Sequence, residues 1–406
     1  MKILIVSCFG TSRSVGKITT LQYEYLKKKG HDVRVCYRGF HEPHISNKDY
    51  VRVAPTLEVV IGRAIAQYTG FEGYTHPIAT RKLIRFTKDF NPDIVQINLL
   101  HGYYINSNKF LSFLKDSNIR TSYTMFDEYA YMGKCAFSFE CNNYLYGCNG
   151  KCPHIHNYPV SKFFDRSKFI WDSKKKVYDS FEKIIFSGTK WVADRAKQSA
   201  LLRKHRIVEL DEPIDFSNVF CPQDTIELRK KLNIPAENKV IVTVAQLSDP
   251  RKGGKYVFEV AKRLLEFRDI TFVFVGCNVP GPFQLDNLIQ IPFVKSQKEL
   301  ALYYSLGDLF ICTSLADTTP CVCIDSLGCG TPLAGFAEAG TPTVCPPEYG
   351  IFTPTYDIEA LAKVILQSPK KTPERINACR KYALGRYAPE VVISKLEYIY
   401  RELINM

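Results

Sequence analysis

Residues 309–335 read LFICTSLADTTPCVCIDSLGCGTPLAG, an apolar strand-like run joined to a helix by a turn rich in threonine and proline. Pro320 suits the first turn of that helix, where its missing N–H is not needed. The free N–H groups and the positive dipole end of a helix start favour a phosphate. Asp317 precedes the helix and Asp325 lies inside it, so one carboxylate is expected on each side of such an anion site, where the pair can hold the hydroxyls of a nucleotide sugar. The spacing is equally compatible with a surface acidic pair beside a helix cap.

Strand-like and helix-like segments alternate along both halves of the chain. Apolar runs that predict strands occupy residues 3–8, 32–37, 93–97, 121–125, 239–245, 270–275, 288–291 and 309–313. Segments that predict helices include residues 17–29, 256–267, 297–306 and 390–403. Alternation of this kind predicts α/β domains, in which helices cover both faces of a doubly wound parallel sheet.

The length predicts two domains, because 406 residues exceed one ordinary domain and suit two of about 200 residues. The alternation pauses before the acidic, proline-containing segment 209–222, which reads as a linker. We therefore predict an N-terminal domain over residues 1–208, a C-terminal domain over 223–388 and a final helix within 389–406.

The composition is that of a soluble globular protein, with 46% hydrophobic and 23% charged residues. No apolar stretch approaches the roughly 20 residues that span a bilayer. The N-terminal apolar run is too short for a signal peptide and predicts a buried strand. These features predict a cytoplasmic protein whose 14 cysteines are mostly thiols, some of them candidate metal ligands.

Basic residues are concentrated in the first half. Residues 1–208 carry 33 Lys and Arg against 17 Asp and Glu, whereas residues 209–406 carry 21 against 24. A basic half can face nucleic acid, an anionic membrane or a phosphorylated acceptor. No DNA- or RNA-binding signature is found, which places nucleic acid last. Two basic stretches with aromatic residues, 81–90 and 161–183, are candidates for membrane contact, although such stripes more often pack into their own domain.

Arg251 and Lys252 follow the strand expected at 239–245 and stand between a proline and two glycines. Arg can bond two phosphate oxygens at once, and Lys adds a mobile point charge. We predict a diphosphate site here in preference to a solvated basic turn. The loop that ends at Gly16 also allows close backbone approach to an anion, but a plain strand-to-helix turn explains it equally well.

Four cysteines lie within the loop 133–159, separated by five, six and three residues. Four thiolates suffice for a closed, structural zinc site. Zinc ribbons use paired Cys-x-x-Cys, so four reduced thiols in a tyrosine-rich loop are the alternative. The candidate ligands are Cys135, Cys141, Cys148 and Cys152.

The two acids, followed by a small-residue helix ending Cys-Gly-Thr-Pro, resemble the acidic signature of retaining glycosyltransferases of family 4. That family has the GT-B fold, two Rossmann-like domains facing a central cleft, and its final helix commonly crosses back to the first domain. The resemblance implies that Asp317 contacts the donor sugar and that Asp325 binds the ribose, although the family usually has Glu at both positions. It also implies donor contacts by Arg251, Lys252, Gly16, Thr318, Thr319, Val294 and Gly340.

Residues 98–159 resemble a branch of family 4 that serves bacterial capsule, O-antigen and exopolysaccharide assembly. The resemblance places His101 and Asp127 on the acceptor side, as catalytic candidates beside Asp317. A buried structural histidine is an equal alternative for His101. The branch usually has His-Asp where this chain has Phe126-Asp127, and many members have Arg in place of Gln246.

The resemblance implies a hexosyltransferase-type enzyme that moves a sugar from a UDP- or GDP-sugar to a lipid-linked glycan acceptor at the inner face of the cell membrane. No metal is required if the basic pair neutralises the diphosphate. The departures at the two acids, Phe126 and Gln246 leave open a catalytically weak or inactive member that acts as a binding or scaffold protein. A sugar epimerase on the same scaffold is a further alternative, because a fold alone does not fix function.

Overall fold

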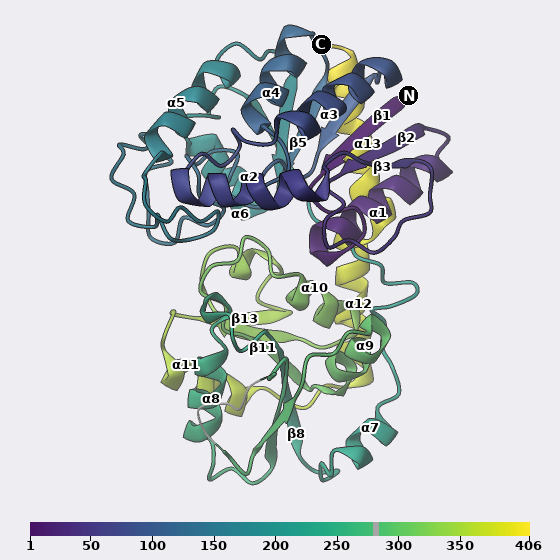
Figure 1. Ribbon diagram of the computed structural model, residues 1–406. Coiled ribbons are helices and arrows are strands. Elements are labelled where there is room, and N and C mark those ends of the chain that lie inside the picture. The colour runs from purple at the N-terminus through teal and green to yellow at the C-terminus, as the bar shows by residue number, and fades with distance from the viewer. Residues whose placement is uncertain (279–283) are drawn as a thin grey trace. The chain divides into compact units, whose positions relative to one another are not determined.

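The structure is a computed structural model that describes residues 1–278 and 284–406. It divides into two compact units (Figure 1). The N-terminal unit comprises Met1–Pro213 and Pro389–Met406, and the C-terminal unit comprises Ile214–Ala388. Each unit contains one parallel sheet covered by helices, which confirms the predicted doubly wound α/β fold class.

The sheet of the N-terminal unit has seven strands in the order β3-β2-β1-β4-β5-β6-β7, all of them parallel. The direction in which successive strands are added to the sheet reverses between β1 and β4. The central strands are apolar and buried on both faces, as parallel strands under two helix layers must be. The strands are β1 Lys2–Ser7, β2 Asp32–Tyr37, β3 Tyr50–Arg52, β4 Ile94–Ile97, β5 Thr121–Met125, β6 Ile184–Gly188 and β7 Arg206–Glu209.

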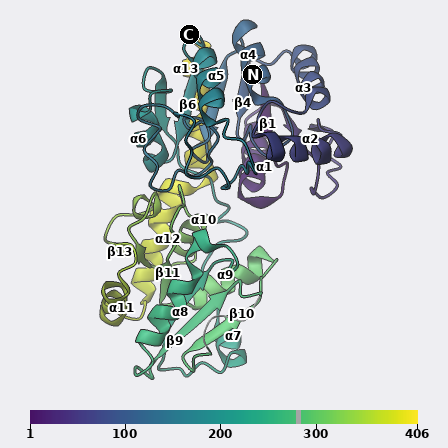
Figure 2. The same ribbon diagram turned by 60° about the vertical axis from the view of Figure 1, so that its left-hand side comes forward.

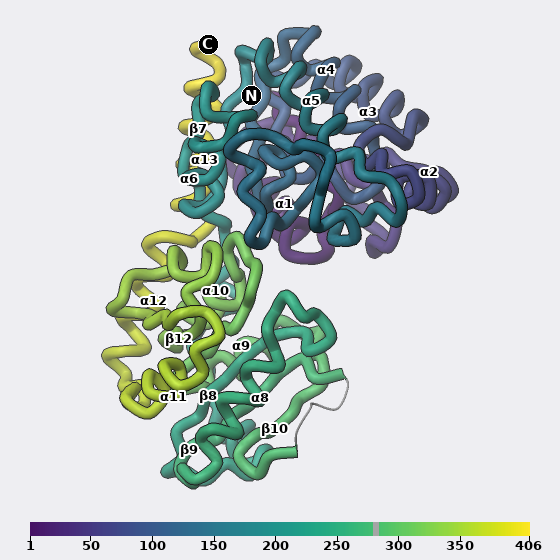
Figure 3. Tube along the Cα trace, turned by 90° about the vertical axis from the view of Figure 1, so that its left-hand side faces the viewer, coloured from purple at the N-terminus to yellow at the C-terminus, as the bar shows by residue number. Residues whose placement is uncertain are grey.

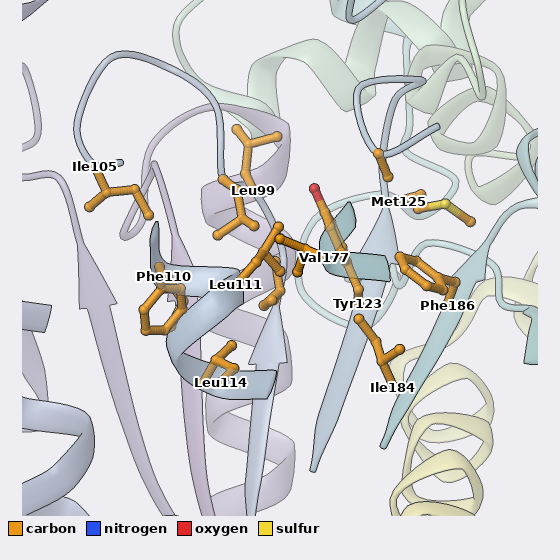
Figure 4. Close-up of a cluster of buried hydrophobic side chains, with 14 of the residues drawn as sticks. Leu99, Ile105, Phe110, Leu111, Leu114, Tyr123, Met125, Val177, Ile184 and Phe186 are labelled. Carbon is orange, nitrogen blue, oxygen red and sulfur yellow. The ribbon is translucent and has the colours of Figure 1, made fainter. Parts of the chain in front are cut away.

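Two helix layers cover this sheet and form its core. On one face, Phe110 and Leu114 pack beside Tyr123, Ile184 and Phe186 (Figure 4). On the other face, α1 and α13 bury a second apolar cluster against β1 and β2. The helices are α1 Arg13–Lys28, α2 Thr56–Thr69, α3 Pro77–Phe90, α4 Ser107–Asp116, α5 Ser167–Tyr178, α6 Lys190–Gln198 and α13 Pro389–Ile404.

The last helix, α13, packs within the N-terminal unit although it follows the C-terminal unit in sequence. Glu397 accepts hydrogen bonds from Lys29 and from His31 Nε2, the latter at 2.9 Å. The Tyr400 hydroxyl donates to Gln96 Oε1 at 3.1 Å inside the core. These contacts and the apolar face of α13 complete one face of the sheet.

The sheet of the C-terminal unit has six parallel strands in the order β10-β9-β8-β11-β12-β13. The order reverses between β8 and β11, where doubly wound sheets bind their ligands. The strands are β8 Lys239–Val244, β9 Ile270–Val275, β10 Leu288–Ile291, β11 Leu309–Cys312, β12 Leu333–Phe336 and β13 Gly350–Thr353. The helices are α7 Ile226–Lys231, α8 Gly254–Arg263, α9 Gln297–Leu306, α10 Cys321–Gly328, α11 Ile358–Gln367 and α12 Pro373–Tyr387, with short 3-10 helices η1 Pro250–Lys252 and η2 Thr341–Thr343.

Candidate functional site

A pocket of about 160 Å³ lies at the carboxyl ends of β8, β9 and β11 in the C-terminal unit. Thr243, Val275 and Cys312, at or near the ends of these strands, line the pocket. Lys252 and Val294, both predicted donor contacts, line it. The pocket therefore sits at the switch point between β8 and β11, the place where a doubly wound sheet leaves a crevice for a ligand.

Lys252 brings a positive charge to this pocket. The Asp249 side chain caps η1 by accepting from Arg251 N at 3.1 Å, and this turn places Lys252 beside Asp317. Lys252 Nζ forms an ion pair with Asp317 Oδ2. Burial alone would lower the pKa of Lys252, but the Asp317 carboxylate raises it above its ordinary value. The ammonium therefore stays charged at neutral pH, as binding of a phosphate requires.

Arg251 has a different position from Lys252. Its guanidinium donates to the Ala316 carbonyl at 2.9 Å and pairs with Asp249 Oδ2 at 3.1 Å. Its own carbonyl accepts from Leu315 N at 2.8 Å. Arg251 thus ties η1 to the turn that carries Asp317, and Lys252 is the member of the predicted basic pair that lines the pocket.

The turn that carries Asp317 is held between two glycines. Gly253 adopts a left-handed conformation with φ of 66°, and a Cβ atom there would overlap the Thr313 carbonyl. Gly340 donates its N–H to the Asp317 carbonyl at 2.9 Å, and a Cβ atom there would overlap the Thr318 carbonyl. The structure therefore brings Gly340, Thr318 and Asp317 together through backbone contacts.

The remaining predicted donor residues of the C-terminal unit are Asp325, Thr319 and Val294. Asp325 lies on α10 and is buried beside Tyr304 and Cys329. Thr319 is buried in the turn before α10, and its hydroxyl donates to the Thr318 carbonyl at 2.7 Å. Val294 and the exposed Phe293 lie in the loop between β10 and α9, and both line the pocket.

In the N-terminal unit, His101 and Asp127 are in direct contact. His101 Nε2 is 2.5 Å from Asp127 Oδ2, and His101 Nδ1 is 3.1 Å from the Tyr158 hydroxyl. The second Asp127 oxygen accepts from Tyr129 N at 2.9 Å. Partners at both ring nitrogens fix the imidazole, and the carboxylate favours a proton on Nε2. Such a pair can hold or move a proton, and its catalytic role stays a prediction, because the burial of His101 also fits the structural alternative.

Glu72 is a buried acid near His101 that the sequence analysis did not single out. Its Oε1 atom accepts from Gly102 N at 3.0 Å and from Tyr103 N at 3.3 Å. Burial raises the pKa of Glu72, while the neighbouring His101 lowers it. A lone glutamate in a glycine-containing loop has no spacing signal, so nothing in the sequence could have identified it. Its role is to hold the backbone that carries His101.

The backbone of the loop before α1 binds the carboxylate of Glu42, a residue of the same chain. The N–H groups of Gly10, Thr11 and Ser12 donate to Glu42 Oε2 at 3.2, 3.0 and 3.2 Å. Gly16 lies inside α1, and a Cβ atom there would come within 2.7 Å of the Thr11 backbone. Close packing of helix on loop therefore accounts for Gly16, and its donor contact stays a prediction.

The four cysteines of the loop 133–159 do not form the zinc site that their number suggested. Across residues 1–278 and 284–406, no three His, Cys, Asp or Glu side chains are grouped to hold a metal ion. Hydrogen bonding to Cys135 lowers the pKa of Cys152 to about 7, and Cys148 packs against Gly133. The loop that carries these thiols consists of turns and bends, without a helix or strand. Cys135, Cys141, Cys148 and Cys152 are free thiols.

Sequence comparisons link the C-terminal unit to a known family. Residues 224–385 match the family model described as Glycosyl transferases group 1. Over 255 residues the chain is 22% identical to the putative colanic acid biosynthesis glycosyl transferase WcaC of Escherichia coli K12. That match spans 61% of this chain and 60% of the relative, less than two thirds of the relative's length.

Solved structures match nearly the whole chain. Sucrose-phosphate synthase from Thermosynechococcus elongatus superposes with a TM-score of 0.68 at 16% identity, covering 100% of this chain and 99% of that one. Anabaena Alr3699/HepE in complex with UDP and glucose gives 0.64 at 13% identity, covering 99% and 100%. WaaG, a glycosyltransferase involved in lipopolysaccharide biosynthesis, gives 0.63 at 14% identity, covering 97% and 99%. The chain therefore has the GT-B fold.

Proposed function

We propose that this chain is a retaining glycosyltransferase that moves a sugar from a nucleotide-sugar donor to a glycan acceptor. The observation that carries the proposal is the Lys252–Asp317 ion pair at the pocket on the β8/β11 switch point. The position of this pocket matches the ligand crevice of doubly wound sheets. The family match over residues 224–385 and the UDP and glucose bound to Alr3699/HepE support a nucleotide-sugar donor.

The proposed chemistry is electrostatic. As the bond between the donor sugar and its diphosphate breaks, negative charge develops on the leaving group. The Lys252 ammonium stabilises that charge, and Arg251 holds the turn from which Lys252 acts. When the diphosphate pairs with Lys252, it replaces Asp317 as the partner of the ammonium. The Asp317 carboxylate can then orient the donor sugar. Asp325 is proposed to bind the ribose. A donor site that needs no metal ion would therefore depend on the Lys252 ammonium, since Lys252 is the member of the basic pair that lines the pocket.

His101 and Asp127 are proposed to act on the acceptor side. With a proton on Nε2 held by Asp127, Nδ1 of His101 is the atom that would take the proton of an attacking hydroxyl, in place of its contact with the Tyr158 hydroxyl. Attack on the face that the leaving group has left gives retention, a step that rests on the resemblance to family 4. The names of WcaC and WaaG support a surface polysaccharide as the product.

The acceptor is proposed to be lipid-linked, and the chain is proposed to work at the inner face of the cell membrane. No helix within residues 1–278 and 284–406 is both long and apolar enough to cross a bilayer. Contact with the membrane is therefore proposed to be peripheral. The excess of Lys and Arg in residues 1–208 supports attraction to anionic lipid.

A catalytically weak or inactive binding protein is the second candidate. One observation favours it: Gln246 lines the pocket at the position where the resemblance expects an arginine. One cation fewer weakens the charge available to the leaving group. Retained donor binding without turnover would identify this second function.

A panel of UDP- and GDP-sugars tests the proposal. We expect one donor to bind and to be hydrolysed slowly, and we expect Asp317→Ala and Arg251→Ala to lower the kcat/KM of hydrolysis about 10- to 100-fold, the size of a lost charged hydrogen bond. The exposed Lys255 on α8 provides a matched control, and Lys255→Ala should leave hydrolysis unchanged. If no donor binds at millimolar concentration, the transferase proposal is wrong.

A further inference from the structure

Helix α2 turns its wider apolar face to solvent. The exposed side chains recur at the spacing of one helix face and include Leu57, which is 70% exposed, and Ile61, which is 50% exposed. The buried face of α2 is narrow and carries Val59, Gly62 and Ala66, and a Cβ atom at Gly62 would come within 2.5 Å of His76 Nε2. A surface helix of a globular domain normally buries its large apolar residues. The outward stripe consists of Leu57, Val60, Ile61, Ile65 and Tyr68.

The stripe continues onto a neighbouring loop. The Tyr68 and Phe163 rings lie 5.7 Å apart, and Lys162 N donates to the Gln67 carbonyl at 2.7 Å. Phe163 is 67% exposed and Phe164 is 53% exposed. We call the stripe together with Phe163 and Phe164 the α2 surface. Helix α2 lies at the edge of the N-terminal unit (Figures 2 and 3). A contiguous exposed apolar surface of this kind marks an interaction site.

Cations flank the α2 surface. Lys162 Nζ lies 4.3 Å from the centre of the Tyr68 ring, and the Arg166 guanidinium lies 5.6 Å from that of Phe164. Arg63 of α2 is exposed, and its guanidinium lies 5.7 Å from the centre of the Tyr103 ring. The acid of α2, Glu58, accepts from the N–H groups at the start of α3 at 2.6 and 2.8 Å, so its charge is used inside the unit. Apolar side chains with a cationic border suit an anionic lipid interface.

A second copy of the chain fits the α2 surface less well than a bilayer, because the border of this surface is cationic. Two copies that meet face to face through the same surface bring like cations together. A bilayer instead offers phosphate groups to Lys162 and Arg166 and an acyl boundary to the aromatic and aliphatic side chains.

We propose that the α2 surface docks this chain on an anionic bilayer, with α2 lying along the interface and Phe163 and Phe164 inserted beside it. The inference deepens the peripheral membrane contact proposed above and rests on it, but not on the transfer reaction. Of the two stretches expected to make the contact, 161–183 contributes Phe163 and Phe164 to this surface, whereas the apolar residues of the helices α3 and α5 do not take part. In α3 and α5, Leu83, Ile170 and Trp171 are buried in their own unit.

Vesicle co-sedimentation of the full chain tests this assignment. The probes are vesicles of phosphatidylcholine alone and of phosphatidylcholine mixed with phosphatidylglycerol, without donor or acceptor. We expect binding to the mixed vesicles that weakens as salt is added. The double change Ile61→Ser with Ile65→Ser should reduce partition about tenfold, because two side chains no longer leave water. Ile226→Ser is the matched control, since Ile226 is 60% exposed on α7 of the other unit.

Two further measurements keep the outcomes distinct. The fluorescence of Trp171 and Trp191, both in the N-terminal unit, checks that the double variant is folded. Donor hydrolysis without vesicles tests the proposed transferase activity separately. Failure of the docking proposal therefore leaves the transferase proposal unaffected, and the reverse also holds. The docking proposal is overturned if the wild type binds neither vesicle or if the double variant binds as well as the wild type. It is also overturned if sedimentation velocity shows a dimer that the double variant abolishes, because the surface is then a contact between copies.

Discussion

Lys252 and Asp317 are 65 positions apart in sequence and share one ion pair in the candidate donor site. Each side chain satisfies the other, so neither charge is left alone in a partly buried place. A diphosphate can replace Asp317 as the partner of Lys252, because it offers the ammonium stronger acceptors than one carboxylate does. In the proposed function, one lysine thus serves both the stability of the unbound pocket and the binding of the donor.

Replacing Lys252 by Met tests this double role. The substitution removes the ammonium, so we expect UDP to bind about 10- to 100-fold more weakly. It also leaves Asp317 buried without its cation, which should lower the free energy of unfolding of the C-terminal unit by about 1–3 kcal/mol. Calorimetric titration with UDP and thermal unfolding measure the two effects, with Lys255→Met as the control. Unchanged UDP binding would contradict the assignment of the pocket.

The sequence predicted these two residues separately and could not predict their contact. Arg251 and Lys252 stand in a local basic turn, and Asp317 belongs to an acidic motif with its own spacing. Their meeting depends on the pairing of β8 with β11, which residue patterns do not specify. Glu42 was missed for a related reason, since a lone acid gives no sign that it will cap a distant loop.

At the scale of elements, hydrophobic periodicity predicts that a helix exists more reliably than it predicts which face is buried. No helix was predicted over the residues of α2, whose large apolar side chains the structure exposes. Its buried face carries Gly62 and Ala66, which are small and give no apolar signal. Helix α3 shows the ordinary case, because its apolar stripe around Leu83 is buried as its period predicts.

Glu397 supplies a test of how α13 is held. Burial raises the pKa of Glu397, but hydrogen bonds from Lys29 and His31 outweigh burial and leave that pKa below its ordinary value. The unfolded chain therefore binds more protons in acid than the folded chain does. It follows that the stabilising contribution of Glu397 is complete above the ordinary glutamate pKa of about 4.3 and is lost as the pH falls through the lower folded value.

We therefore expect Glu397→Gln to lower the free energy of unfolding of the N-terminal unit by about 1–3 kcal/mol at pH 7. The difference from the wild type should shrink below about pH 4. Denaturant unfolding followed by tryptophan fluorescence reports this unit, since both tryptophans lie in it. Glu390→Gln is the control, because Glu390 is exposed and bonds the Tyr25 hydroxyl at 2.8 Å. An unchanged stability difference from pH 7 to pH 3 would contradict this account.

At the scale of the whole molecule, chain length and segment alternation were enough to predict two parallel-sheet units, because each unit repeats the same local pattern. The place of α13 was not available from its own residues, and only the resemblance to family 4 suggested that it joins the N-terminal unit. The residues with proposed functions are also divided between the units. The pocket with Lys252 belongs to the C-terminal unit, whereas His101 and the α2 surface belong to the N-terminal unit.

This division predicts that a nucleotide stabilises one unit and leaves the other unchanged. UDP at a hundred times its dissociation constant should stabilise the unit that binds it by about 2.7 kcal/mol. Hydrogen exchange should slow in residues 249–258 and 313–325, which surround Lys252 and Asp317. Amides of β5 and α2 should exchange at the same rate with and without UDP, because the loop before α1 already has Glu42 as its anion. Lys252→Met should abolish the slowing. Equal protection of both units would show that the nucleotide also reaches the N-terminal unit, in which case Glu42 must leave its loop to make room for the phosphate.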